Sequence, residues 1–156
     1  MSYSQDEQML KQILTTILNS TAGLKYAIII DDTGITIASQ SKFTFNEDDH
    51  ISVDKIGAIG GAVFTAGEEQ GEILGYGGLN LQITEYQKGM IFSIKLDKGA
   101  LVLATDLNIQ VGFIRALLKK WAPNIAKILN RYLESADQES MKEELKELFS
   151  TDSLGF

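Results

Sequence analysis

The residues with the clearest chemical potential are an acidic cluster and the single histidine of the 156-residue chain. Glu47, Asp48 and Asp49 directly precede His50. Carboxylates and imidazole bind metal ions, but three consecutive acids lack both the spacing and the required glycine of a calcium loop. We therefore expect a solvated segment that leads into a helix, since a helix N-terminus favours acidic residues. We predict no metal site and no cofactor.

The other residues that could support catalysis also lack the arrangement that catalysis requires. Asp31 and Asp32 are adjacent in a turn sequence, "DDTG", whereas an acid–base pair needs two carboxylates held apart in different environments. A serine hydrolase would need His50 as its base, and the chain has no G-x-S-x-G motif. The chain has no cysteine, which excludes thiolate metal sites and cysteine nucleophiles. We predict that the protein is not an enzyme and has no catalytic residue.

A glycine-rich stretch, "GAIGGAVFTAGEEQG" at 57–71, raises the question of phosphate binding. It lacks the lysine of a Walker loop and the spacing of a dinucleotide-binding loop. At about 100° per residue on a helix, its five glycines fall within about one third of the circumference, with Phe64 among them. Each glycine costs a helix roughly 0.5–1 kcal/mol relative to alanine. The pattern therefore predicts close packing, either on the protein's own sheet or on the same helix of a second copy across a two-fold axis.

The remaining elements follow from apolar spacing and turn residues. Strand segments are separated by short turns such as "QKG" and "DKG", which favour antiparallel neighbours. Pro123 predicts a kink or a restart inside the last long helix. The result is an α+β fold with helices on both faces of a five-stranded antiparallel sheet, in the order α-β-β-α-β-β-β-α plus a short C-terminal helix. The expected segments are helix 4–20, hairpin 24–40, helix 53–70, three strands within 72–105, helix 109–134 and helix 137–149.

We predict two parts, a domain at 1–134 and a tail at 135–156. The tail contains a short amphipathic segment that is too short to be a stable helix by itself. It docks on the domain, docks on a partner, or frays. Its narrow apolar face consists of Met141, Leu145, Leu148 and Phe149.

Overall charge and composition limit the kinds of partner that the protein can bind. The net charge of −7 argues against nucleic-acid binding. The N-terminal sequence "MSYSQDEQML" lacks the features of a signal peptide, and no apolar run reaches membrane-spanning length. We expect a cytoplasmic protein that binds no nucleic acid and does not insert into a membrane.

Three passages of the chain resemble the Roadblock family. They are "YAIIIDDTGITIAS", "AIGGAVFTAGEE" and "LVLATDLNIQVGFIR", and the resemblance covers about residues 5–133. It implies a longin-like fold that dimerises by aligning the third strand and the central helix of two copies. The implied interface residues are Gly57, Gly60, Gly61, Phe64, Gly67, Leu79, Leu81 and Ile83.

The resemblance also implies a function. Roadblock domains offer a platform to small Ras-like GTPases, so we predict a non-catalytic homodimeric scaffold or regulator that modulates a GTPase cycle, for example as a GTPase-activating protein. An arginine finger would have to be Arg115 or Arg131, the only arginines, and we expect both to be surface charges or helix-end partners. The alternative is a small-molecule sensor with a longin/profilin-like sheet, in which Thr84, Tyr86 and Ser93 would line a pocket.

Overall fold

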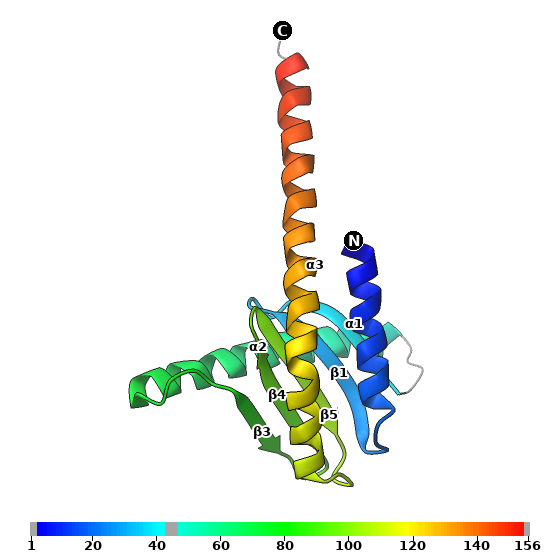
Figure 1. Ribbon diagram of the computed structural model, residues 1–156, viewed down its shortest axis with the longest axis vertical. Coiled ribbons are helices and arrows are strands. Elements are labelled where there is room, and N and C mark those ends of the chain that lie inside the picture. The colour runs from blue at the N-terminus through cyan, green and yellow to red at the C-terminus, as the bar shows by residue number, and fades with distance from the viewer. Residues whose placement is uncertain (1–2, 43–46, 155–156) are drawn as a thin grey trace.

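The computed structural model describes residues 3–42 and 47–154, and it describes side chains for 5–42 and 53–150. Figure 1 shows the helices and a twisted sheet, and the elements follow the order α-β-β-α-β-β-β-α. The elements are α1 (Tyr3–Leu18), β1 (Leu24–Asp31), β2 (Thr36–Ser41), α2 (Glu47–Leu74), β3 (Leu81–Glu85), β4 (Met90–Leu96), β5 (Gly99–Thr105) and α3 (Val111–Leu154).

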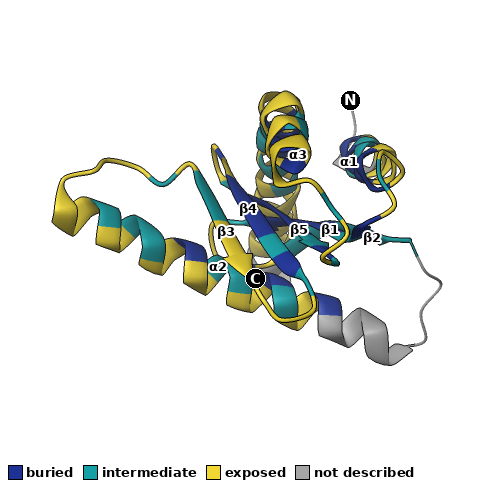
Figure 2. Cartoon of the chain, turned by 90° about the horizontal axis from the view of Figure 1, so that it is seen from below, coloured by how far each residue is buried: buried dark blue, intermediate teal, exposed yellow. Residues whose placement is uncertain are grey.

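The sheet has the order β2-β1-β5-β4-β3, and every neighbouring pair of strands is antiparallel. Helices α1 and α3 cover one face, and α2 crosses the other (Figure 2). The predicted α+β class with helices on both faces is confirmed. The strands β3, β4 and β5 form a meander because each connecting turn is only a few residues long.

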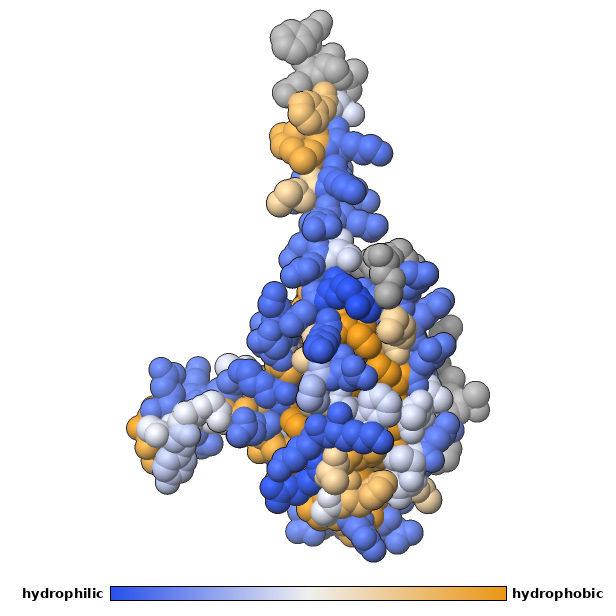
Figure 3. All heavy atoms as spheres, in the orientation of Figure 1, coloured by the Kyte–Doolittle hydropathy of each residue, from blue (hydrophilic) through white to orange (hydrophobic). Residues whose placement is uncertain are grey.

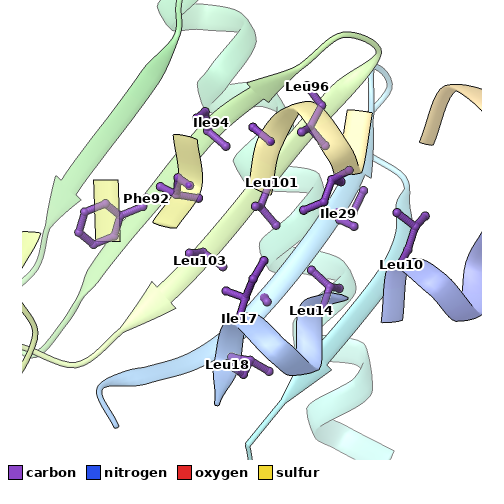
Figure 4. Packing of buried hydrophobic residues seen from close by; sticks show 14 of the residues in the cluster. Leu10, Leu14, Ile17, Leu18, Ile29, Phe92, Ile94, Leu96, Leu101 and Leu103 are labelled. Carbon is purple, nitrogen blue, oxygen red and sulfur yellow. The ribbon is translucent and has the colours of Figure 1, made fainter. Parts of the chain in front are cut away.

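The core lies on both faces of the interior strand β1. Ala27 and Ile29 face the cluster beneath α1 and α3, while Ile28 and Ile30 face α2. Figure 4 shows leucine and isoleucine side chains of α1 pointing toward the sheet. Successive strand residues point to opposite faces, so the nearly continuous apolar run of β1 gives the sheet two buried faces.

Helix α3 is longer than predicted. It runs without interruption through Pro123 to Leu154, so the predicted restart and the separate helix at 137–149 are wrong. Ala122 and Ile125 are buried on either side of the proline, and this packing keeps the helix continuous. No glycine or proline occurs between Pro123 and Gly155, so nothing in the sequence ends the helix earlier.

An ion pair joins the first and last helices. The Nε and Nη2 atoms of Arg131 donate to Oδ1 of Asp6 at 3.0 and 2.8 Å, and Asp6 is fully buried. The hydrogen bond to this carboxylate raises the pKa of the Arg131 guanidinium. The charge of Arg131 therefore compensates a carboxylate that has little access to water.

We expect Arg131→Ala to lower the melting temperature more than Lys11→Ala does. The first change leaves the buried Asp6 without its cation, whereas Lys11 contacts Glu7 at 3.6 Å in an exposed pair. Arg131→Lys should recover only part of the loss, because lysine cannot donate two hydrogen bonds in a fixed fork. Thermal unfolding followed by circular dichroism measures all three variants. Equal melting temperatures for the two alanine variants would contradict this role.

Candidate interaction surface

At the β3 edge of the sheet, backbone groups point outward and can bond to another strand. Tyr86 donates its backbone N–H to Gly89, and Lys95 donates to Asn80. Because hydrogen-bonded and non-hydrogen-bonded pairs alternate in antiparallel strands, the even-numbered residues of β3 bond to β4. The backbone groups of Leu81, Ile83 and Glu85 therefore point outward.

The two edges of the sheet differ. Pairing of β3 with β4 is regular over five residues, whereas pairing of β2 with β1 is shifted between Ile29 and Ile30. A bulge of this kind twists a strand and disfavours pairing with another chain. Strand β3 contains no proline, and Ile83 is 38% exposed. It is therefore the edge that is better suited to association.

Helix α2 overhangs this edge. It crosses beneath the sheet and continues past β3, as Figures 1 and 2 both show. Its projecting end and the loop that follows carry exposed apolar side chains, with Ile73 85% and Tyr76 79% exposed. Closer to the sheet, Ile59 and Val63 are also exposed. These side chains form an apolar surface that the described part of the chain leaves uncovered.

A groove of about 240 Å³ lies where α2 passes β3 and β4. Its wall on the helix is apolar, and its wall on the sheet carries three hydroxyl groups. The lining residues are Ile56, Ile59, Gly60, Val63, Gln82, Thr84, Tyr86, Ile91, Ser93 and Val102. The three hydroxyl-bearing residues suggested for a pocket, Thr84, Tyr86 and Ser93, are thus brought together.

Most of the glycine-rich face of α2 meets the protein's own chain. A Cβ atom added at Gly61 would lie 3.0 Å from the Cα of Gly34, and one at Gly57 would lie 2.7 Å from Oγ1 of Thr36. At Gly60 the nearest atom would be 3.7 Å away, which is an ordinary contact. The glycines let α2 approach the β1–β2 hairpin, which is the first of the two packing alternatives.

The remaining predicted interface residues lie nearer the free edge. Phe64 is only 5% exposed, and Gly67 is close to Leu79 and to the side chain of Gln82. Leu79 and Leu81 are half-buried. The role of the eight residues as a dimer interface stays a prediction. Sequence reasoning did not name Ile59 and Val63 as interface residues, although their four-residue spacing puts them on one face.

The candidate catalytic and metal groups have structural roles or lie outside the description. Oδ1 of Asp31 accepts hydrogen bonds from the backbone of Thr33 and Ile35 and from the Thr33 hydroxyl, as expected for a turn. The side chains of Glu47, Asp48, Asp49 and His50 are outside the described residues, and 47–50 form the first turn of α2. Among described side chains, no group of three acids or histidines is placed to hold a metal ion. The described helices include none with the length and apolarity needed to cross a bilayer.

Solved structures with the same arrangement define the class. The "MglB with tetrameric arrangement" structure superimposes with a TM-score of 0.71 at 17% identity, covering 81% of this chain and 92% of that one. MglB from Thermus thermophilus gives 0.70 at 16% identity, over 81% and 92%. A Roadblock/LC7 domain from Streptomyces avermitilis gives 0.65 at 13% identity, over 80% and 97%. The chain has the Roadblock, longin-like fold.

Sequence relatives define the family more narrowly. The chain belongs to the same family as "Uncharacterized protein MJ0310" and "Uncharacterized protein MJ1340" of Methanocaldococcus jannaschii. Each is 30% identical over 108 residues, which cover 69% of this chain and 90% of the relative. "Uncharacterized protein MJ0714" of the same organism is 29% identical over 119 residues, covering 76% and 95%. No family model matches the chain.

Proposed function

We propose that this protein is a non-catalytic homodimeric scaffold that binds a small Ras-like GTPase and regulates its nucleotide cycle. The observation that carries the proposal is the open β3 edge beneath an overhanging α2, on a Roadblock fold. Regulation rather than catalysis fits the fold class. The absence of cysteine fits a reducing cytoplasm, where we place the protein.

The dimer forms through β3 and α2. The outward backbone groups of Leu81, Ile83 and Glu85 pair with the same strand of a second copy, and two five-stranded sheets become one. The overhanging part of α2 then lies beside the strands of the second copy. Ile59 and Val63 become buried, because a two-fold axis brings identical apolar surfaces together.

The GTPase binds to the platform that this dimer creates. An arginine finger does not fit the mechanism at Arg131, since its guanidinium is bound to Asp6. Arg115 is exposed near the start of α3, but nothing aims it at a partner. We therefore propose that any stimulation of hydrolysis comes from ordering the GTPase's own switch regions.

The test is a pull-down with tagged protein from lysate of the source organism. One sample of the lysate receives GDP, and a parallel sample receives a non-hydrolysable GTP analogue. We expect mass spectrometry to identify a small GTPase, enriched at least several-fold in one nucleotide state. Equal recovery in both states would support a static scaffold and exclude the regulatory role. Absence of any GTPase from both samples would contradict the proposal.

A small-molecule sensor is the second candidate, and the groove next to β3 favours it. Thr84, Tyr86 and Ser93 offer hydroxyl groups to a polar edge of a ligand whose body contacts Ile59 and Val63. A ligand of the folded state raises its stability. A thermal-shift screen with metabolites should then find a compound whose effect is lost in Ser93→Val. No shift from any compound would leave the scaffold as the better proposal.

The division into a domain at 1–134 and a tail at 135–156 also remains a proposal. Tyr132 and Leu133 are the last residues of α3 that pack against the core. From Asp137 to Ser150 every residue of the helix is exposed. The tail is thus a continuation of α3 that leaves the domain.

A further inference from the structure

Charge is segregated along α3. Residues 111–133 contain five basic residues and no acidic one, so this half carries +5. Residues 134–154 contain seven acidic residues and two lysines, so this half carries −5. The first half packs on the domain and the second half projects from it (Figure 1).

The electrostatics of the helix itself does not favour this pattern. A helix is stabilised by acidic residues near its N-terminus and by basic residues near its C-terminus. Helix α3 has no acidic residue in its first turn and no basic residue in its last turn. The charge order is the reverse of the one that the helix dipole favours, so the dipole does not explain the segregation of charge along α3.

The basic half of α3 presents three lysines on its outer face. At about 100° per residue, Lys119, Lys120 and Lys127 lie opposite the residues that face the core, and all three are exposed. The core-facing residues are Ile114, Leu118, Ile125 and Leu129.

The apolar stripe of the projecting half lies on this same outer face. Figure 3 shows an apolar patch on the projecting helix, surrounded by hydrophilic side chains. Its members are Met141, Leu145, Leu148 and Phe149, which are 47–70% exposed. Because the stripe points away from the core-facing side, a continuous α3 cannot turn it onto the chain's own sheet.

We propose that α3 pairs in antiparallel fashion with α3 of a second copy. A two-fold axis near residue 131 then lays the acidic, apolar half of each helix along the basic half of the other. The contact is self-complementary in charge, as a symmetric interface requires. The second copy is favoured over another partner because both complementary halves are present in this one helix.

The spacing of the charges fits such a pairing. Asp137 and Glu144 are about 10.5 Å apart along the helix, and Lys119 and Lys127 are about 12 Å apart. Glu144 next to Lys119 of the partner subunit therefore places Asp137 close to Lys127 of the partner subunit. The same register brings Met141 to Pro123 of the partner subunit.

This interface does not rest on the proposed function. The side of α3 that packs on the sheet points away from the face that pairs with the second copy. The β3 edge stays free, and α3 pairing can occur with or without a β3 dimer. Two distinct two-fold contacts on one chain would produce closed rings or open arrays.

The test uses charge reversal with mixing. All proteins carry Ile83→Lys, which removes association through β3 if that occurs. One variant adds Lys119→Glu and Lys127→Glu, and a second adds Asp137→Lys and Glu144→Lys. A matched control adds Lys55→Glu and Lys88→Glu, two exposed lysines that lie in α2 and in the β3–β4 turn. Circular dichroism verifies that each variant is folded, and sedimentation velocity measures its mass.

We expect the parent and the control to dimerise at low salt and to dissociate at high salt, because salt screens exposed charges. Each reversed variant alone should associate at least tenfold more weakly. Their equimolar mixture should form a heterodimer. A monomeric parent, unchanged association of the reversed variants, or a mixture without heterodimer would each overturn the proposal. These results leave the β3 dimer untouched, since that is tested by comparing wild type with Ile83→Lys.

Discussion

Ile83→Lys is expected to convert the β3-linked dimer into separate subunits, with association weakened at least a hundredfold, or about 2.7 kcal/mol. Ile83 is the middle residue of β3 and its backbone groups point away from β4. The two-fold axis of the proposed dimer passes close to it, so lysine would place two like charges opposite each other in a buried contact. Sedimentation equilibrium in about 0.5 M salt measures the effect, because pairing through exposed charges of α3 is screened there.

The control is Ile35→Lys, the same chemical change at an exposed isoleucine in the β1–β2 turn. It should leave the mass unchanged. The same two proteins can be used in the GTPase pull-down, where loss of capture in Ile83→Lys alone would tie GTPase binding to the dimer. A dimer of wild-type affinity in Ile83→Lys would show that β3 is not the interface.

Gly61→Leu is expected to destabilise the fold by about 3 kcal/mol, the upper end of typical overpacking costs. The Cβ atom alone would lie 3.0 Å from the Cα of Gly34, which is too close. Gly34 has a φ of 86° in the β1–β2 turn. The rest of the leucine side chain has no space unless α2 moves away from the sheet. Urea denaturation followed by circular dichroism gives the change in the free energy of unfolding.

Gly60→Ala is the matched control on the same helix. Its Cβ atom would contact Val102 at 3.7 Å without a clash, so the change should stabilise the protein by about 0.5–1 kcal/mol through helix propensity. A lower free energy of unfolding in Gly61→Leu together with a higher one in Gly60→Ala would establish which glycines are needed for close approach. Wild-type stability in Gly61→Leu would contradict the observed packing of α2.

Local signals in the sequence were sufficient to predict the strands. The turn "DDTG" marked the first hairpin, and the side chain of Asp31 does organise that turn. The short turns after β3 and β4 marked the meander, which is confirmed. These elements were predictable because a hairpin depends on residues that are close in the chain.

The helices were predicted less well, since their limits depend on distant contacts. Pro123 normally ends a helix, but burial of Ala122 and Ile125 overrides it. The glycine pattern of α2 showed which residues share a face, but not that Gly57 and Gly61 face the β1–β2 hairpin. The sequence suggested Thr84, Tyr86 and Ser93 of the groove, but not its wall on α2, because that wall exists only where α2 passes β3 and β4.

The order of the strands has a kinetic consequence. Ile28 of β1 pairs with Val102 of β5, 74 positions later, so these two neighbouring strands can meet only after a long loop closes. The β1–β2 hairpin and the β3–β4–β5 meander are local and can form early, but each then exposes an apolar face. The docking of β1 on β5 is therefore expected to limit the folding rate. During synthesis the N-terminal hairpin therefore lacks its β5 neighbour until residue 105 has left the ribosome.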